Sequence, residues 1–177
     1  MNLKDRFLVY GRSHARVRRL FVFVAASIFA VGGVIVGAGQ ASADVVVGPT
    51  QYQNKAGGLC LDDYGASTAN YNMVDVWTCN GSNAQQWYYD LSYDSLYVNI
   101  NGTIKCLDVR NSGSAPGTRV DIYQCNGTSA QIWYQTQNGN WVNPIANLCL
   151  DDPSGSDQAG MYVQVWTCNG ETPQVWL

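Results

Sequence analysis

Three aspartates in this sequence are each followed, at one constant spacing, by an aromatic residue. The pairs are Asp62 with Trp77, Asp108 with Tyr123, and Asp151 with Trp166. A carboxylate can accept hydrogen bonds from two neighbouring hydroxyl groups, and an aromatic ring can pack against an apolar C–H face. A pyranose presents both features, so we interpret each pair as a candidate carbohydrate-binding site.

Each pair lies within a longer pattern that occurs three times. A copy reads Cys-Leu-Asp, then an aromatic residue followed by x-Cys-Asn-Gly, and finally Gln-x-Trp. The copies span residues 60–87, 106–133 and 149–176, with the same internal offsets. Constant offsets are typical of an internal repeat. We place the repeats at about residues 44–93, 94–138 and 139–177.

The amino-terminal 43 residues have the composition of a secretory signal. Residues 1–19 are rich in Lys and Arg, residues 20–38 form an uncharged apolar run, and Ala41-Ser42-Ala43 is an A-x-A pattern. We predict a signal peptide over residues 1–43, cleaved before Asp44, and a secreted, extracellular protein. An uncleaved membrane anchor formed by residues 20–38 is the alternative. A twin-arginine signal at Arg18-Arg19 is a third reading.

Removal of the signal changes the charge of the chain. It takes away six of the ten basic residues but one of the thirteen acidic residues, which leaves four against twelve. An acidic domain is a poor partner for nucleic acid or for an anionic membrane. The one histidine, His14, lies within the signal. A Ser/His/Asp triad, a Cys/His pair and a His-ligated metal site are therefore excluded, and we expect no catalytic residue, metal or cofactor.

All six cysteines lie after the signal, two in each repeat. Because equivalent repeats should form equivalent bonds, we expect the disulfides Cys60–Cys79, Cys106–Cys125 and Cys149–Cys168. Each would close a loop of about 20 residues and stabilise the domain by roughly 3 kcal/mol. Such bonds require an oxidising compartment, in agreement with secretion. A zinc site is the rival use of cysteines, but the sequence has no C-x-x-C spacing.

Short runs of β-forming residues alternate with clusters of Gly, Asn, Ser and Asp. Runs with strand periodicity cover residues 73–78, 120–124 and 162–167, and no stretch has sustained helical periodicity. We predict a single all-β domain with about four short strands in each repeat. Closure of three repeats into a threefold barrel would remove sheet edges and bury the apolar faces together. Trp87, Trp133 and Trp176 would then share one core.

The repeated C-L-D, W-x-C-N-G and Q-x-W motifs resemble those of the ricin-type β-trefoil lectin domains, also called Q-x-W lectins and family 13 carbohydrate-binding modules. The resemblance covers residues 50–177. It implies a twelve-stranded β-trefoil, one disulfide per repeat and up to three shallow sugar sites. It also implies that the Asp of each pair is the sugar-binding carboxylate and the aromatic residue is the stacking platform.

The third repeat matches the family's site best. Gln164 occupies a place where the family commonly has a sugar-binding Gln, whereas Asp75 and Asp121 stand there in the first two repeats. A second carboxylate could accept further hydroxyls, or the two carboxylates could repel each other and one could take a proton. The family also often has Asn before the Gln of Q-x-W. That Asn is replaced here by Ala84, Ala130 and Pro173.

Two further sets of polar residues complete the candidate sites. Asn80, Asn126 and Asn169 could replace the missing Asn donors, or could act as turn residues in their Asn-Gly pairs. Gln85, Gln131 and Gln174 could orient the site carboxylates, satisfy backbone groups or contact the sugar.

The sequence favours a secreted, monomeric carbohydrate-binding protein without catalysis, whose partner is a polysaccharide or glycan. A glycoside hydrolase is one alternative, but a repeated aspartate is poor support for a single catalytic centre, and Glu171 is the only Glu after residue 43. A trefoil that binds proteins, such as a protease inhibitor, is the other. Inhibitors of this fold act through one distinctive loop, and no loop here departs that far from its counterparts. The identity of the sugar is left open.

Overall fold

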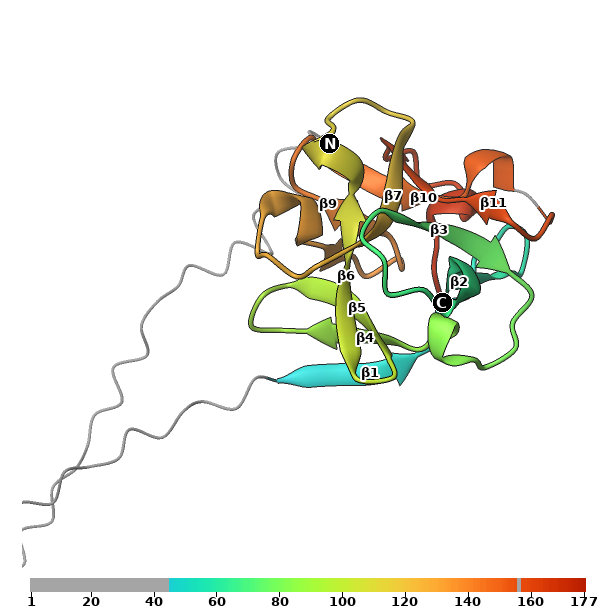
Figure 1. Ribbon diagram of the computed structural model, residues 1–177. Helices are drawn as coiled ribbons and strands as arrows, with labels where there is room; N and C mark the ends of the chain where they lie inside the picture. Colours follow the sequence, from blue (N-terminus) through green and yellow to red (C-terminus); the bar gives the residue numbers. More distant parts are fainter. Residues whose placement is uncertain (1–44, 156) are drawn as a thin grey trace, which may run out of the picture. The chain divides into compact units, whose positions relative to one another are not determined.

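The computed structural model describes residues 45–155 and 157–177 (Figure 1). The predicted signal at residues 1–43 lies outside these residues. Within residues 45–155 and 157–177, twelve strands form one curled sheet: β1 (Val46–Thr50), β2 (Cys60–Asp63), β3 (Asn72–Trp77), β4 (Trp87–Asp90), β5 (Ser95–Ile100), β6 (Thr103–Val109), β7 (Thr118–Tyr123), β8 (Tyr134–Gln135), β9 (Trp141–Asn143), β10 (Leu148–Asp151), β11 (Met161–Tyr162) and β12 (Gln164–Thr167). The all-β prediction is confirmed.

In the part of the chain that the structure describes, six single-turn 3-10 helices occupy the connections between strands. They are η3 (Tyr64–Ala66), η4 (Asn83–Gln85), η5 (Arg110–Ser112), η6 (Ser129–Gln131), η7 (Pro153–Gly155) and η8 (Thr172–Gln174). Three of them follow the Cys-Leu-Asp strands, and three carry the Gln of Q-x-W. Turns this short have no hydrophobic periodicity, so the sequence pattern does not reveal them.

In each repeat, the Cys-Leu-Asp strand forms an antiparallel hairpin with the strand that ends near the aromatic residue of the pair. Cys60 lies opposite Trp77 in β2–β3, Cys106 opposite Tyr123 in β6–β7, and Cys149 opposite Trp166 in β10–β12. The predicted strands at 73–78, 120–124 and 162–167 agree with the observed ones to within about two residues, except that the third is divided at Val163.

The three hairpins pair with one another in a closed triangle. The start of β3 pairs with the end of β7 through Met73 and Asp121. The start of β7 pairs with β12 through Arg119 and Gln164, and β11 pairs with β3 through Tyr162 and Asp75. Each hairpin therefore pairs with the other two through its edge strands, so that the three hairpins form a closed ring. This is the threefold closure that a β-trefoil requires.

The three Q-x-W tryptophans lie in the shared core, as predicted. Trp87, Trp133 and Trp176 are at most 1% exposed. Each indole Nε1 donates to the backbone oxygen of the Leu in its own Cys-Leu-Asp segment, at 2.9, 3.0 and 3.1 Å. Because the only polar atom of each ring is paired, the whole side chain can be buried without an unsatisfied donor.

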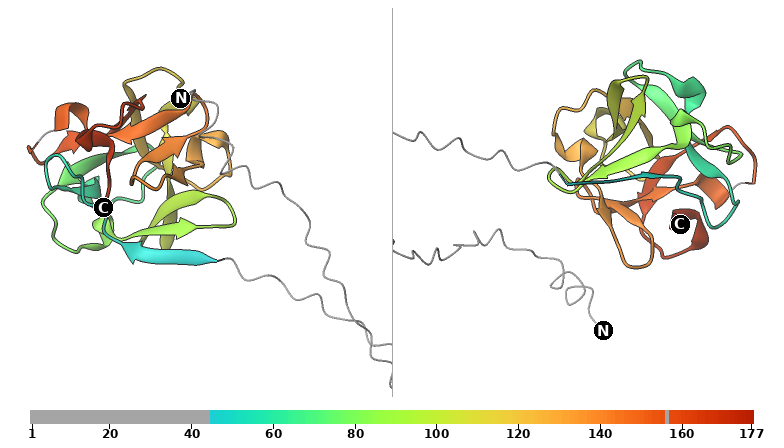
Figure 2. Two further views of the ribbon diagram at one scale, coloured as in Figure 1. Left: turned by 180° about the vertical axis from the view of Figure 1, so that it is seen from behind. Right: turned by 90° about the horizontal axis from the view of Figure 1, so that it is seen from below.

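The two ends of the described chain depart from strict threefold symmetry. β1 lies along β4, with Val47 opposite Tyr89 (Figure 2). The last residues form no full strand, and the barrel closes through reciprocal 2.9 Å backbone bonds between Gln53 and Leu177. No helix within residues 45–155 and 157–177 has the length and apolar character to cross a membrane.

Candidate functional site

The hairpin register places the carboxylate and the aromatic ring of each pair on one face. Alternate residues of a strand point to the same side, so Asp62 lies on the face that carries Cys60 and its cross-strand neighbour Trp77. The same register holds in the other two hairpins. The three predicted pairs are thus brought together in space.

The predicted disulfides are confirmed. Cys60–Cys79, Cys106–Cys125 and Cys149–Cys168 each join the hairpin to the loop that follows its aromatic residue, with a Cα–Cα distance of 5.1 Å in all three. The bond ties the Asn-Gly turn to the strand that carries the aspartate, so the loop beside each candidate site is held covalently.

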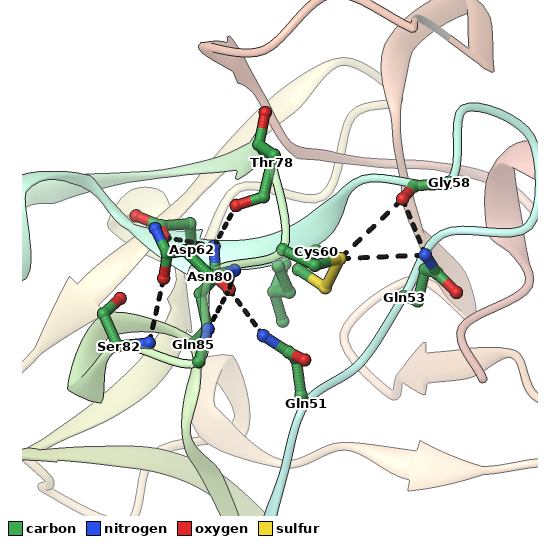
Figure 3. Close-up of a disulfide and its surroundings, with 12 residues drawn as sticks. Gln51, Gln53, Gly58, Cys60, Asp62, Thr78, Asn80, Ser82 and Gln85 are labelled. Atoms are coloured by element: carbon green, nitrogen blue, oxygen red, sulfur yellow. Dashed lines mark hydrogen bonds between the residues drawn. A yellow bond between two sulfur atoms is a disulfide. The ribbon is translucent and has the colours of Figure 1, made fainter.

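The Gln of each Q-x-W segment is bonded to the site carboxylate, as Figure 3 shows for Gln85 and Asp62 in repeat 1. Gln85 Nε2 donates to Asp62 Oδ2 at 2.8 Å and to the Thr78 backbone oxygen at 3.0 Å, while its Oε1 accepts from Asn80 N at 2.8 Å. Gln131 and Gln174 form the same bonds to Asp108 and Asp151 in their own repeats. All three Gln side chains are at most 1% exposed, so they orient the carboxylates from inside the fold.

The predicted Asn residues lie at the surface beside the sites. Asn80 Oδ1 accepts from Ser82 N at 2.9 Å, Asn126 Oδ1 from Thr128 N at 3.1 Å, and Asn169 Oδ1 from Glu171 N at 2.9 Å. Each side-chain oxygen thereby closes an Asx turn, which is the turn-forming role considered for these residues. All three Asn side chains are exposed.

The aromatic platforms differ in exposure. Trp77 and Trp166 are both 42% exposed, whereas Tyr123 is half-buried. The site aspartates themselves are only 6–7% exposed. Repeats 1 and 3 therefore combine a nearly buried carboxylate with an open ring.

The cross-strand neighbour of the aspartate also differs between repeats. In repeat 3, Gln164 Nε2 donates to Asp151 Oδ2 at 2.8 Å. In repeat 2, Asp121 forms a 2.8 Å ion pair with Arg110 Nε. In repeat 1, Asp75 lies opposite Asp62, and both Asp75 oxygens are buried without a hydrogen-bond partner within the described residues. In repeat 3 a neutral donor thus faces the aspartate, while repeat 1 brings two carboxylates together.

Burial raises the pKa values of several carboxyl groups in the first two repeats. Desolvation, together with repulsion from the charge of Asp62, raises the pKa of Asp75 to about 7. Desolvation raises the pKa of Asp121 to about 6, because Arg110 only partly offsets it. Burial also raises the pKa values of Asp62 and Asp108, and the Gln hydrogen bonds act in the opposite direction. Removal of a carboxylate from water favours its neutral form unless donors or cations compensate.

Two cavities in the described part of the chain are lined by none of the residues Trp77, Tyr123 and Trp166. A cavity of about 620 Å³ lies beside Pro173 and Glu171, away from the aromatic platforms. A second cavity, of about 230 Å³, lies between Tyr71, Arg110, Arg119 and Asp121. Within the described residues no group of three or more His, Cys, Asp or Glu side chains could hold a metal ion.

Fold and site together define a β-trefoil with three carboxylate-plus-aromatic sites related by a pseudo-threefold axis. The model of the ricin-type β-trefoil lectin domain matches residues 48–176, and the chain belongs to this family. No curated protein sequence matches the chain significantly.

Solved structures support the same assignment. The designed threefold-symmetric protein ThreeFoil shares 26% identity with a TM-score of 0.64, covering 71% of this chain and 94% of that chain. The agglutinin from Abrus precatorius also shares 26% identity with a TM-score of 0.64, covering 77% of this chain and 49% of the agglutinin. An exo-β-1,3-galactanase from Clostridium thermocellum shares 27% identity with a TM-score of 0.62, covering 71% of this chain and 28% of the enzyme.

Three residues near the repeat 2 site are not among the predicted site residues. They are Asn70 and Tyr71 from repeat 1, and Arg110, which follows the Cys-Leu-Asp segment of repeat 2. Their signal in the sequence is a difference between repeats: Tyr71 stands where the other copies have Gly117 and Gly160. That difference acquires a meaning only when the neighbouring repeat is placed beside it.

Proposed function

We propose that this domain is a secreted lectin that binds a polysaccharide or glycan without catalysis, through as many as three shallow sites. The observation that carries the proposal is the repeated arrangement of a nearly buried carboxylate, a buried Gln that orients it, and an aromatic ring on the same hairpin face.

Each part of this arrangement has a role in sugar recognition. One oxygen of Asp62 accepts from Gln85 while the other has no partner within the described residues and is not fully buried, so it can accept from sugar hydroxyls. A charge-assisted hydrogen bond of this kind is stronger than one between neutral groups. The exposed face of Trp77 offers an apolar surface to the C–H face of the pyranose.

Several sites on one rigid body compensate for weak individual binding. A single shallow site binds with a Kd near the millimolar range, about −4 kcal/mol. Simultaneous engagement of repeated sugar units raises the overall affinity without new contacts. A polysaccharide or a clustered glycan is therefore the expected ligand.

Glycan-array binding and affinity electrophoresis test this function. The panel should include β-1,3-galactan, because one structural neighbour is a galactanase, together with xylan, arabinan and mannan. We expect Asp62→Ala and Asp151→Ala to weaken binding, and Asp157→Ala, at an exposed carboxylate that belongs to none of the three pairs, to leave it unchanged. The proposal is wrong if the wild-type protein binds no glycan on a broad panel.

Secretion is tested separately. Expression of the full chain with its first 43 residues should yield extracellular protein that begins at Asp44, as measured by mass spectrometry of the culture medium. Recovery of the uncut chain in the membrane fraction would instead support the anchor reading of residues 20–38.

A further inference from the structure

Each aromatic platform is flanked by one residue from the neighbouring repeat. Gly160 lies beside Trp77, Gly117 beside Trp166, and Tyr71 beside Tyr123. The three flanking residues are equivalent, since each backbone N–H donates to the strand residue that precedes the platform: Gly160 to Val76, Gly117 to Val165, and Tyr71 to Ile122, at 2.8–2.9 Å.

The flanking glycines leave their platforms open, whereas Tyr71 covers its own. A Cβ atom on Gly160 would lie 3.5 Å from Trp77 Cζ3, and one on Gly117 would lie 3.6 Å from Trp166 Cζ3. Any side chain at these positions would therefore start at the edge of the platform ring. Tyr71 has such a side chain, and its ring centroid lies 4.8 Å from that of Tyr123, at an interplanar angle of 53°.

The loop that carries Tyr71 is anchored to repeat 2 by Asn70. Its Oδ1 accepts from Gln124 N at 2.9 Å and from Lys105 Nζ at 2.7 Å. The equivalent residues in the other two repeats are Pro116 and Ala159, whose side chains cannot form these bonds. The anchor is thus specific to the repeat that presents a tyrosine.

Arg110 contacts both the backbone and the ring of Tyr71. Its Nη2 donates to the Tyr71 backbone oxygen at 3.1 Å, and its guanidinium carbon lies 5.6 Å from the centroid of the Tyr71 ring. Its Nε donates to Asp121, so the cross-strand carboxylate of the site is already engaged. The equivalent positions hold Tyr64 and Pro153, neither of which carries a charge. Asp121, Arg110, Tyr71 and Tyr123 therefore form one connected group.

Tyr71 adopts a backbone conformation that suits glycine. Its φ is 63°, where Gly117 and Gly160 have 89° and 91°. A bulky residue in this region is unfavourable unless its surroundings hold it there, and such positions cluster at functional sites. The contacts from Asn70, Arg110 and Tyr123 supply that restraint.

We propose that Tyr71 closes the repeat 2 site by occupying the face of Tyr123 on which a sugar would pack. This inference rests on the proposed lectin function. It assigns sugar binding to repeats 1 and 3 and makes residue 71 a determinant of the number of sites. The repeat 2 hairpin keeps Asp108 and its Gln131 bond, so the closed site retains the carboxylate that sugar binding requires.

The test uses affinity electrophoresis in gels that contain β-1,3-galactan, xylan, arabinan or mannan. In the Asp62→Ala/Asp151→Ala protein, repeats 1 and 3 are disabled, and we expect no retardation on the polysaccharide that slows the wild type. Addition of Tyr71→Gly should restore retardation, and Asp108→Ala should abolish it again. Tyr71→Asn, which also tolerates positive φ, is a second opening variant in case the glycine weakens folding.

The reciprocal variant provides a matched control. Gly160→Tyr should remove the contribution of repeat 1, measured in the Asp151→Ala protein, where repeat 1 is the binding site that remains. Thermal unfolding of each variant confirms that the fold is retained. The proposal is overturned if the Asp62→Ala/Asp151→Ala protein is still retarded and Asp108→Ala abolishes that retardation. It is also overturned if neither Tyr71→Gly nor Tyr71→Asn restores retardation to the Asp62→Ala/Asp151→Ala protein.

These outcomes separate the two proposals. If the wild type is not retarded on any of the four polysaccharides or on the array, the proposed function fails by itself. In that case, retardation of a Tyr71 variant that depends on Asp108 would still support the closure of repeat 2. Absence of retardation in those variants as well would overturn the closure.

Discussion

Asp62 and Asp75 lie directly opposite each other on β2 and β3, with 7% and 0% of their surfaces exposed. At the same cross-strand place in repeat 3, Asp151 faces Gln164, which donates a hydrogen bond to it. Two carboxylates this close, one of them without any donor within the described residues, cannot both remain charged at low cost. In the first repeat, the carboxyl group of Asp75 therefore titrates beside the site carboxylate, whereas Gln164 of the third repeat is a neutral donor.

Stability should fall as the pH rises from about 5 to 8. The pKa values of Asp63 and Asp75 are raised to about 7, and that of Asp121 to about 6, in each case mainly by burial. Between the unfolded pKa of Asp, about 3.9, and these folded values, the native state binds more protons than the unfolded state. The stabilisation is complete below the unfolded pKa and is lost as the pH passes the folded pKa. Urea unfolding at pH 5 and pH 8 measures the difference.

Asp75→Asn should flatten this pH dependence. The amide cannot ionise and can donate to Asp62, so we expect the variant to be more stable than the wild type at pH 8, by on the order of 2 kcal/mol. Asp157→Asn, at an exposed carboxylate, is the control and should leave the curve unchanged. Equal pH dependence in wild type and Asp75→Asn would show that another group is responsible.

Sugar binding by repeat 1 should be stronger at pH 6 than at pH 8. A protonated Asp75 can donate to Asp62 as Gln164 donates to Asp151, whereas an ionised Asp75 repels it. Asp75→Gln should remove the pH dependence, measured by affinity electrophoresis in the Asp151→Ala protein. An effect of a few fold is expected. A wild-type repeat 1 with the same binding at both pH values would contradict this prediction.

Gln174→Ala should cost both stability and binding. The amide group joins Asp151, the Thr167 backbone oxygen and the Asn169 N–H, and its loss removes these three bonds, although Asp151 keeps its bond from Gln164. We expect a destabilisation of about 2 to 3 kcal/mol and weaker binding through repeat 3. Gln86→Ala changes a partly exposed Gln with one 3.1 Å bond and serves as the comparison. Denaturant unfolding and affinity electrophoresis measure the two effects.

Loss of an exposed tryptophan should mainly reduce sugar binding, whereas loss of a buried tryptophan should mainly reduce the stability of the fold. Trp166→Ala removes a ring that is 42% exposed, so it should reduce binding while costing about 1 to 2 kcal/mol of stability. Trp87→Ala removes a fully buried ring with a satisfied Nε1 and should destabilise the fold by about 3 to 5 kcal/mol. Thermal unfolding and glycan binding of the two variants, measured in parallel, distinguish a ring that binds sugar from a ring that stabilises the core. A large loss of stability in Trp166→Ala would place that ring in the core instead.

Much of the fold could be predicted because the repeat imposes constant offsets. Cys60 and Cys79 recur with one spacing in every copy, so one pairing scheme satisfies all six cysteines. The buried role of Trp87 follows from the same regularity, as does the β periodicity of the segment before Trp77. The 3-10 helices and the division of the third strand at Val163 escaped prediction, because three-residue turns and local breaks leave no periodic signal.

The sequence by itself determined which residue types recur: the Asp proposed to accept from sugar hydroxyls, the ring proposed to stack, and the Gln that follows them. Tertiary structure decided how the three copies differ. Closure of the hairpins into a triangle sets residue 71, 117 or 160 of one repeat against the platform of another, so the openness of a site depends on a residue far away in the chain. The same packing excludes water from the carboxyl of Asp75. The energy of a buried charge and the cover over a ring both depend on spatial neighbours, which a repeat pattern does not specify.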